Sequence, residues 1–555
     1  MTFVKDVEML GNDFWNWRTL QQPRSHDDIP RLERPKNWRP AWSAEDVSGY
    51  QENIEQFEKR WKAIDAGPVT SPNFDTESWV DYQLIGSAIY RVYWELDYIK
   101  IWQEQPRFYI DQTVGVLFDL LLPPKLGSDV IQESINVLSY TSKVLDDGIA
   151  NLEGKAIAPF GQVAIDLLAN IEKQIATVVA ELIIIDETGS GEALESAGQS
   201  AVEALVNYRT WLISNLPNMR PIKAIGAEKY QWFFAHVALV PFSTHELRMI
   251  GQIEWDRAVT FEYVTMNKNR NIALPPIPKT AEEQISQEAL KEAEVRAFYT
   301  GEGILSQPNS LKHYLTAPLP PYLAPIKWLG VTDDLTGPSR VDEDGYSYVP
   351  EPHEALPYFY AANARDTRAG IVHEGAHYQQ LAISWRHQRP LRHHYYDSGV
   401  NEGIAFYNEE LLLAAGLFND APHSQTVIYN FMKLRAMRVI VDVELATGRI
   451  DIPTATAYLE KKVPMDHETA YEEAVFFSSN PGQALTYQIG KTQIIKLFSD
   501  AIAQKRAESE VFNMQEFHDY LWLNGNVPLS LLRFEYLNDS SDIELIQKTK
   551  NRKEE

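Results

Sequence analysis

The sequence predicts a mainly α protein with at most a small β element. Segments with apolar residues at positions i, i+3, i+4 and i+7, the pattern of an amphipathic helix, run through most of the 555 residues. This pattern is absent over a long stretch only once, between about residues 273 and 358. Hydrophobic residues make up 44% and charged residues 23% of the chain, a composition typical of folded proteins. We therefore expect a large helical body with a packed core.

The first half of the chain predicts helices alone. The periodic segments lie at about 51–64, 76–103, 128–151, 160–186, 191–215, 243–272 and 281–306. The most apolar stretch, from Ile175 to Ile185, contains Glu181 and is much shorter than the roughly 20 residues that span a bilayer. We interpret it as a core helix and expect no transmembrane segment.

The second half predicts a short irregular region followed by more helices. Pro-rich and Gly/Asp-rich pieces mark residues 273–358, where runs such as Ile326–Val331 and Tyr346–Val349 could form strands. Helical periodicity returns at about 363–388, 399–416, 423–447, 466–478, 481–505, 513–524 and 528–537. The predicted organisation is therefore a helical N-terminal half (1–272), a connecting region (273–358) and a helical catalytic half with the metal site (359–555).

Charge and cysteine content exclude several classes of function. The chain has 51 Lys and Arg against 77 Asp and Glu, a net charge of −26, and such a surface repels phosphate backbones and anionic headgroups. We expect neither nucleic acid nor a membrane as partner. Because there is no cysteine, any metal must bind to His and carboxylate groups. The first residues lack the basic start and apolar run of a signal peptide, which predicts a cytoplasmic location.

The strongest functional signal is a complete His-Glu-x-x-His motif at residues 373–377. Residues four apart on a helix face the same way, so His373 and His377 can bind one metal ion while Glu374 reaches the water bound to it. A catalytic zinc ion needs a third protein ligand and one open position. Glu402, on the next predicted helix, is the best candidate. The sequence therefore predicts one Zn²⁺ per chain, held by His373, His377 and Glu402.

Several further motifs resemble the bacterial family called domain of unknown function 885 (DUF885), zinc metallopeptidases of the glutamate-zincin kind. They are Glu402-Gly-Ile-Ala-Phe-Tyr-Asn-Glu409, Arg438-Val-Ile-Val-Asp442, Pro481-Gly-Gln-Ala-Leu-Thr-Tyr487-Gln-Ile-Gly490 and Gly525-Asn-Val-Pro528-Leu529. The arrangement is also similar to that of helical zinc oligopeptidases and carboxypeptidases. The resemblance implies a helical hydrolase built around a deep cleft.

The chain departs from the family pattern at three places. Many members have a Pro-Gly pair before the second His of the motif, whereas this chain has the uninterrupted form. Leu445 or a neighbour stands where many members have His, and Phe476-Phe477 stands where many have Arg-Tyr. If those polar groups contact substrate in relatives, the substrate of this chain is different and less anionic.

The motifs predict a division of labour at the site. Zinc lowers the pKa of its bound water, and Glu374 is predicted to be the general base that removes the proton. Tyr487 is predicted to donate a hydrogen bond to the developing oxyanion, because the resembled helical peptidases supply a Tyr or His from a downstream helix. His467 and His518 are alternatives for that role, and a purely structural Tyr487 also remains open.

The predicted function is zinc-dependent hydrolysis of amide bonds in short peptides. Two alternatives remain: hydrolysis of a non-peptidic amide in a biosynthetic or detoxifying pathway, and a helical binding protein whose zinc is structural or lost. The sequence does not predict the oligomeric state.

Two polar clusters outside the motif predict structure. Arg438 and Asp442, four apart on a helix, are expected to form an ion pair, with a substrate carboxylate as the alternative partner of Arg438. A basic cluster is expected to be a solvated loop and not a second metal site; it comprises His387, Arg389, Arg392, His393 and His394.

Overall fold

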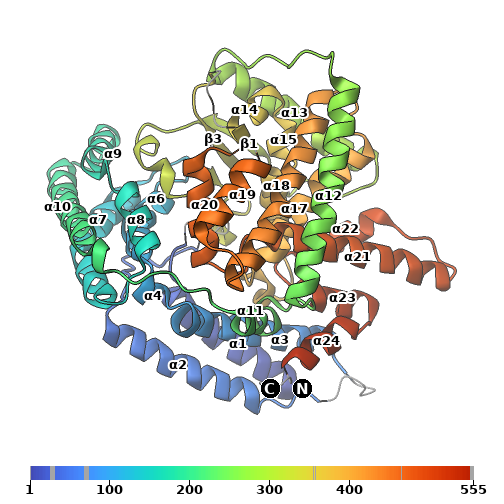
Figure 1. The fold of residues 1–555 in the computed structure, drawn as a ribbon, viewed down its shortest axis with the longest axis horizontal. Coiled ribbons are helices and arrows are strands. Elements are labelled where there is room, and N and C mark those ends of the chain that lie inside the picture. Colours follow the sequence, from blue (N-terminus) through green and yellow to red (C-terminus); the bar gives the residue numbers. More distant parts are fainter. Residues whose placement is uncertain are drawn as a thin grey trace.

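The structure is a computed structural model that describes residues 2–25, 32–67, 74–353, 356, 358–463 and 465–550. Within these ranges the chain is mostly helical and contains one three-stranded sheet, so the predicted mainly α fold is confirmed. Figure 1 shows α7, α9 and α10 side by side at one end and the long α12 and α18 near the other. No helix of the described residues is long and apolar enough to cross a bilayer.

The helices before the sheet correspond to the predicted helical N-terminal half and its continuation. They are α1 (Thr2–Gln21), α2 (Ala44–Ala63), α3 (Thr76–Tyr93), α4 (Ile101–Glu104), α5 (Pro106–Ile110), α6 (Val116–Leu120), α7 (Ser128–Leu152), α8 (Ala158–Leu167), α9 (Ile171–Ile185), α10 (Gly191–Asn215), α11 (Ala227–Phe233), α12 (Thr244–Asn269) and α13 (Ala281–Gly301). The predicted helix 76–103 ends early, because the chain passes through a π-turn (Trp94–Tyr98) and then takes a left-handed conformation at Lys100.

The sheet lies in the predicted connecting region. Its order is β1-β3-β2, with β1 (Tyr314–Pro318) parallel and β2 (Asp333–Asp334) antiparallel to the central β3 (Gly345–Val349). The predicted strand Tyr346–Val349 is confirmed as β3. The predicted strand Ile326–Val331 is wrong, because Ala324–Leu329 forms a 3₁₀ turn that begins with Pro325 in its first turn.

The helices after the sheet carry the motifs. They are α14 (Tyr358–Arg365), α15 (Arg368–Ile371), α16 (Glu374–Ser384), α17 (Ser398–Ala415), α18 (Pro422–Ala446), α19 (Ile452–Lys462), α20 (His467–Ser479), α21 (Thr486–Ala507), α22 (Met514–Leu523), α23 (Leu529–Leu537) and α24 (Ser541–Lys550). Where one helix was predicted over 363–388, the structure has the three short helices α14, α15 and α16.

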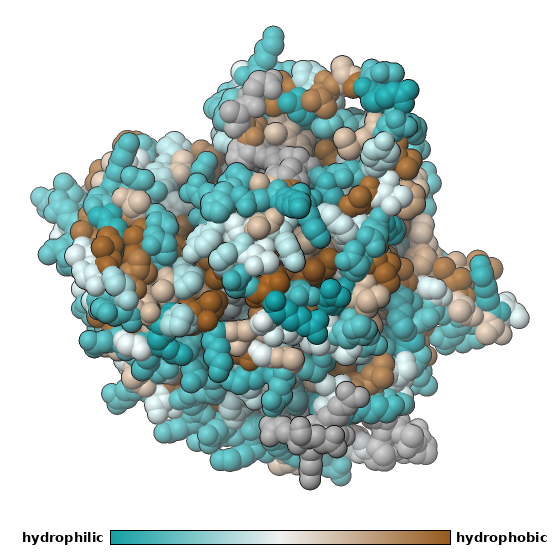
Figure 2. All heavy atoms as spheres, viewed as in Figure 1, coloured by the Kyte–Doolittle hydropathy of each residue, from teal (hydrophilic) through white to brown (hydrophobic). Residues whose placement is uncertain are grey.

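The two halves share one hydrophobic core. The largest cluster of buried apolar side chains contains Phe14 and Ile85 from the first half and Phe406 and Trp522 from the second. Figure 2 shows the outer face as mostly hydrophilic, with apolar residues in separate patches, as the charge of the chain predicts. The halves are therefore parts of one body with a common interior.

The basic cluster after α16 is a buried anchor between the halves, so the prediction of a solvated loop is wrong. Arg392 is 2% exposed and its guanidinium pairs with Asp81 of α3 at 2.9 Å and with Glu535 of α23 at 2.5 Å. Arg389 also pairs with Asp81, at 2.7 Å. The ring of His394 stacks on Trp15 of α1 with 4.2 Å between centroids. Carboxylates on distant helices explain this burial, and the sequence spacing gives no sign of them.

Candidate metal centre

Three of the predicted site residues meet in the interior. One possible ligand atom from each of His373, His377 and Glu402 lies within 4.8 Å of the other two, and all three side chains are buried. Glu402 Oε2 is 3.3 Å from His377 Nε2 and 3.6 Å from His373 Nε2. The structure therefore brings together the residues that the motif and the downstream glutamate predict.

The start of α16 sets the direction of the two imidazoles. His373 is the N-cap residue of α16 and Glu374 its first residue, so the motif begins a helix instead of lying inside one. The His377 N–H still donates to the His373 carbonyl at 3.2 Å, which preserves the i, i+4 relation. The two rings are consequently close and nearly perpendicular, with centroids 5.0 Å apart. Glu374 is half-buried beside them.

Helix α17 brings the third carboxylate to this point. The Asp397 side chain caps the helix by accepting a hydrogen bond from the Gly399 N–H at 2.8 Å, and Arg91 of α3 pairs with the same carboxylate. About three turns after this cap, Asn408 Nδ2 donates to the Val372 carbonyl at 2.7 Å. This bond attaches α17 to the backbone just before the motif and fixes Glu402 relative to His373.

A close crossing of α17 and α21 sets the depth of the site. Gly403 and Gly490 face each other, and a Cβ atom on Gly403 would lie 2.7 Å from the Gly490 Cα. No side chain fits between the two helices at this point. Glu402 precedes one of these glycines, and Tyr487 lies one turn before the other.

A second buried carboxylate supports His373 from behind. Glu409, 1% exposed, places Oε1 2.7 Å from His373 Nδ1 and 3.1 Å from Arg435 Nη2. A carboxylate at Nδ1 holds the imidazole proton there and leaves the Nε2 lone pair for a metal. Glu409 closes the motif that begins at Glu402, but the motif does not indicate a role for it, and no pattern in the sequence indicates Arg435. The available signal for Glu409 was its place two helical turns after Glu402, on the same face.

The charges of the site depend on each other. Burial lowers the pKa of His373, but Glu402 and Glu409 outweigh it and raise that pKa to about 9. Burial raises the pKa of Glu402, but His377 and His373 outweigh it and hold that pKa far below its usual value.

The donor set fits a zinc ion. Both ring nitrogens of His377 and Oε2 of Glu402 are buried and have no hydrogen-bond partner among the described residues. Such orphaned polar atoms are costly unless a ligand satisfies them. Ligand atoms held tetrahedrally about 2.1 Å from a zinc ion lie about 3.4 Å apart. The 3.3 and 3.6 Å separations match that value.

Tyr487 also lies at the site, while the two histidine alternatives do not suit its role. Its ring stacks on His373 with 6.2 Å between centroids and an interplanar angle of 12°. Both nitrogens of His518 are engaged, with Tyr407 Oη at 3.0 Å and the Ile304 carbonyl at 2.8 Å. His467 is exposed and contacts Glu460. Of the three candidates for the oxyanion donor, Tyr487 is the one in contact with a predicted metal ligand.

The predicted pair between Arg438 and Asp442 is wrong. Arg438 binds Glu473 of α20 with two hydrogen bonds, at 2.6 and 3.0 Å. Asp442 instead accepts hydrogen bonds from the backbone N–H groups of Gly482 and Leu485 and from Tyr230 Oη. Asp442 therefore anchors the turn that leads into α21 and to Tyr487. Helical spacing alone does not reveal backbone donors on a distant loop.

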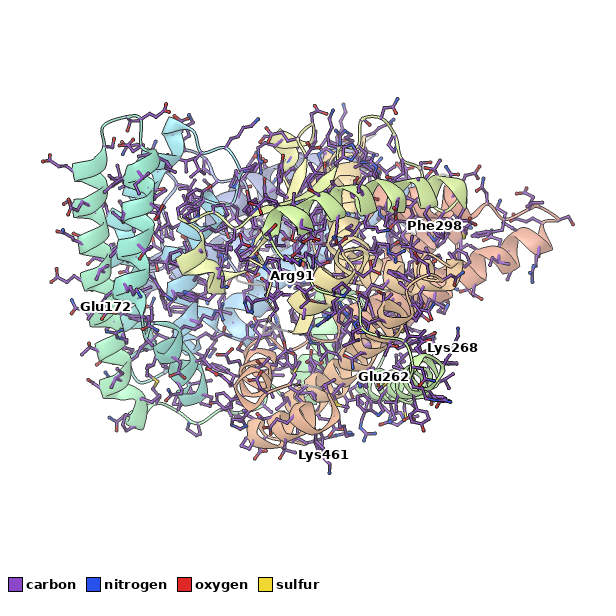
Figure 3. The ribbon with its side chains drawn as sticks, turned by 90° about the horizontal axis from the view of Figure 1, so that it is seen from above. Arg91, Glu172, Glu262, Lys268, Phe298 and Lys461 are labelled. Carbon is purple, nitrogen blue, oxygen red and sulfur yellow. The ribbon has the colours of Figure 1, made fainter. Side chains whose placement is uncertain are left out.

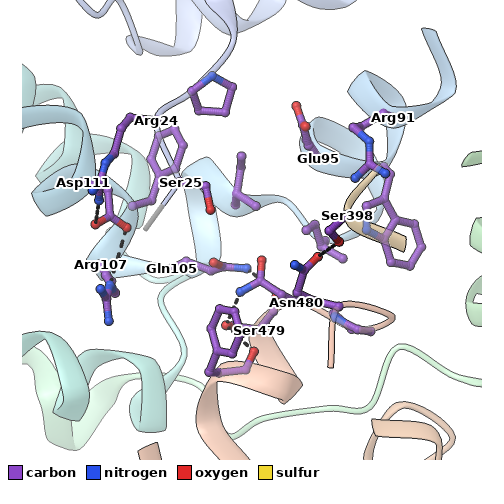
Figure 4. Close-up of a pocket in the computed structure, with 18 of the residues that line it drawn as sticks. Arg24, Ser25, Arg91, Glu95, Gln105, Arg107, Asp111, Ser398, Ser479 and Asn480 are labelled. Carbon is purple, nitrogen blue, oxygen red and sulfur yellow. Dashed lines mark hydrogen bonds and ion pairs between the residues drawn. The ribbon is translucent and has the colours of Figure 1, made fainter. Parts of the chain in front are cut away.

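A cavity of about 200 Å³ lies between the two halves of the chain. Its walls come from α1, α3, α5 and α8 on one side and from α17, α20 and the turn before α21 on the other. Figure 4 shows Arg24, Asp111 and Arg107 at one side of it and Arg91 and Ser398 at the other. Figure 3 likewise places Arg91 near the middle of the molecule. Ser398 precedes Glu402 by one helical turn, about 5.4 Å along the axis of α17, so this end of the cavity lies near the metal centre, but none of the three predicted ligands lines the cavity.

Comparisons with known proteins give a family match over part of the chain and a similar fold over nearly all of it. Residues 326–535, which contain all three predicted ligands, match the family described as bacterial protein of unknown function (DUF885). The fold resembles the structure of a "putative lipoprotein of unknown function" from Shewanella oneidensis, with a TM-score of 0.71 at 14% identity over 97% of this chain and 100% of that one. A "putative lipoprotein" from Colwellia psychrerythraea gives 0.71 at 15% identity, over 99% of both chains. No curated protein matches the chain.

Proposed function

We propose that this protein is a zinc-dependent hydrolase of amide bonds in short peptides. The observation that carries the proposal is the meeting of His373, His377 and Glu402 in the interior, where both ring nitrogens of His377 and Oε2 of Glu402 have no hydrogen-bond partner among the described residues. Two His and one Glu form a typical ligand set of catalytic zinc, which keeps a position open for water. The second carboxylate at His373 and the adjoining cavity agree with a site that binds substrate.

The residues around the ligands would divide the reaction between them. A bound zinc ion would supply Lewis acidity and a water molecule of lowered pKa. Glu374, half-buried beside the ligands, would take the proton of the attacking water and pass it to the leaving amine. Tyr487 would donate to the oxygen of the attacked carbonyl, and Glu409 would hold His373 in its ligating tautomer.

Metal content and turnover test this proposal together. The purified protein should contain about one zinc per chain, and His377→Ala should lose most of it. Glu374→Gln should keep the zinc while hydrolysis of a mixed dipeptide and tripeptide library falls by about 10³-fold or more. His467→Ala, at an exposed histidine outside the cluster, is the matched control and should change neither quantity.

A His377→Ala protein that retained its full zinc content would place the metal elsewhere. Zinc at full occupancy with no turnover of peptides would favour the binding-protein alternative, in which zinc is structural. The cytoplasmic location remains a prediction, and the two structurally similar proteins are described as lipoproteins. Fractionation of cells producing the native protein decides between cytoplasm and envelope.

A further inference from the structure

We propose that the cavity beside the metal centre binds the C-terminal residue of a short peptide, with its α-carboxylate at Arg107 and its side chain against apolar walls. The protein would then act as a carboxypeptidase or dipeptidase. This inference rests on the proposed hydrolase and specifies which end of the substrate it recognises.

The position of the cavity suits the C-terminal end of a short peptide bound at the metal centre. Ser398, in its wall, lies one turn of α17 before Glu402, and one turn spans about 5.4 Å. Ser398 Oγ contacts Gln483 at 3.0 Å, in the segment that leads to Tyr487. A peptide residue spans at most about 3.6 Å, so one or two residues reach from the centre into the cavity.

Arg107 is the guanidinium of this wall that needs a partner. Among the residues that the structure describes, its single ion pair joins Nε to Asp111 Oδ2 at 3.6 Å, longer than a hydrogen bond. Its Nε–H has no hydrogen-bond acceptor within the same part of the chain. Burial lowers the pKa of Arg107 and outweighs the opposing effect of Asp111. A ligand carboxylate would meet the fork of Nη1 and Nη2 in the bidentate way that guanidinium groups favour.

The other arginines of the wall, Arg24, Arg18 and Arg91, are already engaged. Arg24 pairs with Asp111 at 3.2 Å and with Asp119 at 3.1 Å. Arg18 pairs with Glu95 at 2.5 Å, and Arg91 donates to the Tyr396 carbonyl and pairs with Asp397. These contacts hold α1, α3 and α17 in place around the cavity. Among these arginines, Arg107 has the longest contact to a carboxylate, 3.6 Å to Asp111, and it lies at the side of the cavity away from Ser398 (Figure 4).

The other residues that line the cavity determine which side chain of the C-terminal peptide residue fits there. Phe108, Phe160 and Phe476 line the cavity on α5, α8 and α20. Glu472 also lines it and interacts electrostatically with Arg107. One carboxylate can be balanced by Arg107, whereas an acidic side chain would meet Glu472 as well. The cavity therefore favours a terminal residue with an apolar side chain.

Paired ligands that differ at one terminus test the inference. Acetyl-Ala-Phe with a free carboxylate and its C-terminal amide are titrated calorimetrically into zinc-loaded Glu374→Gln protein, which holds the substrate without cleaving it. The acid should bind at least tenfold more tightly than the amide. Arg107→Gln, made in the same background, should reduce that preference to below about threefold, and Arg107→Lys should retain an intermediate preference. Acetyl-Ala-Glu should bind more weakly than acetyl-Ala-Phe.

The matched control is Arg209→Gln, because Arg209 pairs with Glu172 on the α9–α10 side of the molecule, away from the cavity. It should leave the preference for the acid unchanged. Equal binding of acid and amide to the parent protein would overturn the inference, even if wild-type enzyme cleaves peptides internally. A preference that depends on Arg107, without cleavage of any peptide by zinc-loaded wild-type protein, would support the pocket and reject the hydrolase.

Discussion

The ring and the hydroxyl group of Tyr487 have different predicted roles: the ring packs at the site, and the hydroxyl donates a hydrogen bond during catalysis. The ring stacks on His373 and lies 5.3 Å below the guanidinium carbon of Arg435. Tyr487→Phe keeps these contacts, so the melting temperature should change little while kcat falls about 10²-fold and KM changes less. Steady-state kinetics and thermal unfolding measure both. An intact kcat with a lower melting temperature would make Tyr487 structural.

Glu288 provides a pH-dependent prediction away from the ligands. This buried side chain of α13 accepts hydrogen bonds from Gln284 and Asn363, and burial outweighs them and raises its pKa to about 7 from 4.5. The Glu288 carboxyl group therefore binds its proton more tightly in the folded protein than in the unfolded chain. The stability gained in this way is complete below pH 4.5 and is lost as the pH rises through 7.

Glu288→Gln removes the titrating carboxyl group and should make the free energy of unfolding depend less on pH. Between pH 4.5 and 8 the wild-type protein should lose up to about 3 kcal/mol of unfolding free energy relative to the variant. Urea unfolding at both pH values measures the difference. Glu294→Gln, at an exposed position of the same helix, should follow the wild type. Parallel curves for wild type and Glu288→Gln would show that Glu288 ionises normally.

At the scale of residues, the sequence predicts which three side chains meet at the candidate metal centre but not the groups around them. His373, His377 and Glu402 belong to a motif whose spacing reflects the chemistry of one metal ion. Arg435 reaches Glu409 from another helix, and Arg107 reaches the cavity from the N-terminal half. Their positions depend on tertiary packing, which no local pattern in the sequence predicts.

At the scale of elements, periodicity predicts long helices well and their interruptions poorly. Helix α10 has the predicted bounds 191–215, and α7 ends one residue later than predicted. The predicted helix 160–186 is divided into α8 and α9 at residues 168–170, although apolar residues continue across the break. Buried turns retain the apolar pattern of the helices beside them, so the pattern alone does not reveal these turns.

The crossing of α17 and α21 gives an element-scale prediction. Gly490→Ala would place a methyl group against the backbone of α17 at Gly403 and Gly399, which must move the helix that carries Glu402. We expect zinc affinity to fall at least tenfold, together with some loss of stability. A competition titration with a zinc-binding dye measures the affinity.

Gly251→Ala provides the control for that experiment. It would introduce a methyl group 3.0 Å from the Val439 side chain, where α12 crosses α18 and no ligand lies nearby. This variant should lose stability without losing zinc affinity. If folded Gly490→Ala protein binds zinc as tightly as wild type, the crossing does not position the site.

At the scale of the whole molecule, Arg392 links the two halves through a buried charge network. Arg392→Met would leave Glu535 without this cation and Asp81 with Arg389 alone. Removal of one member of a buried pair costs about 3–5 kcal/mol, so the melting temperature should fall by several degrees. Arg60→Met, which breaks an exposed pair with Asp13, should cost no more than about 1 kcal/mol. Equal stability of both variants would show that the network contributes nothing.

The order in which the chain is synthesised has a consequence for the cavity. The wall residues of α1 to α8 leave the ribosome first, and at about 5–20 residues per second the interval from Val163 to Glu402 lasts about 10–50 s. During that interval the aromatic side chains of this wall face water without α17 and α20 against them. A nascent chain that stops before residue 373 has half of the cavity and none of the three predicted ligands. Incomplete translation products would thus expose aggregation-prone apolar surface that chaperones and proteases recognise. They would also lack the three residues predicted to bind the metal.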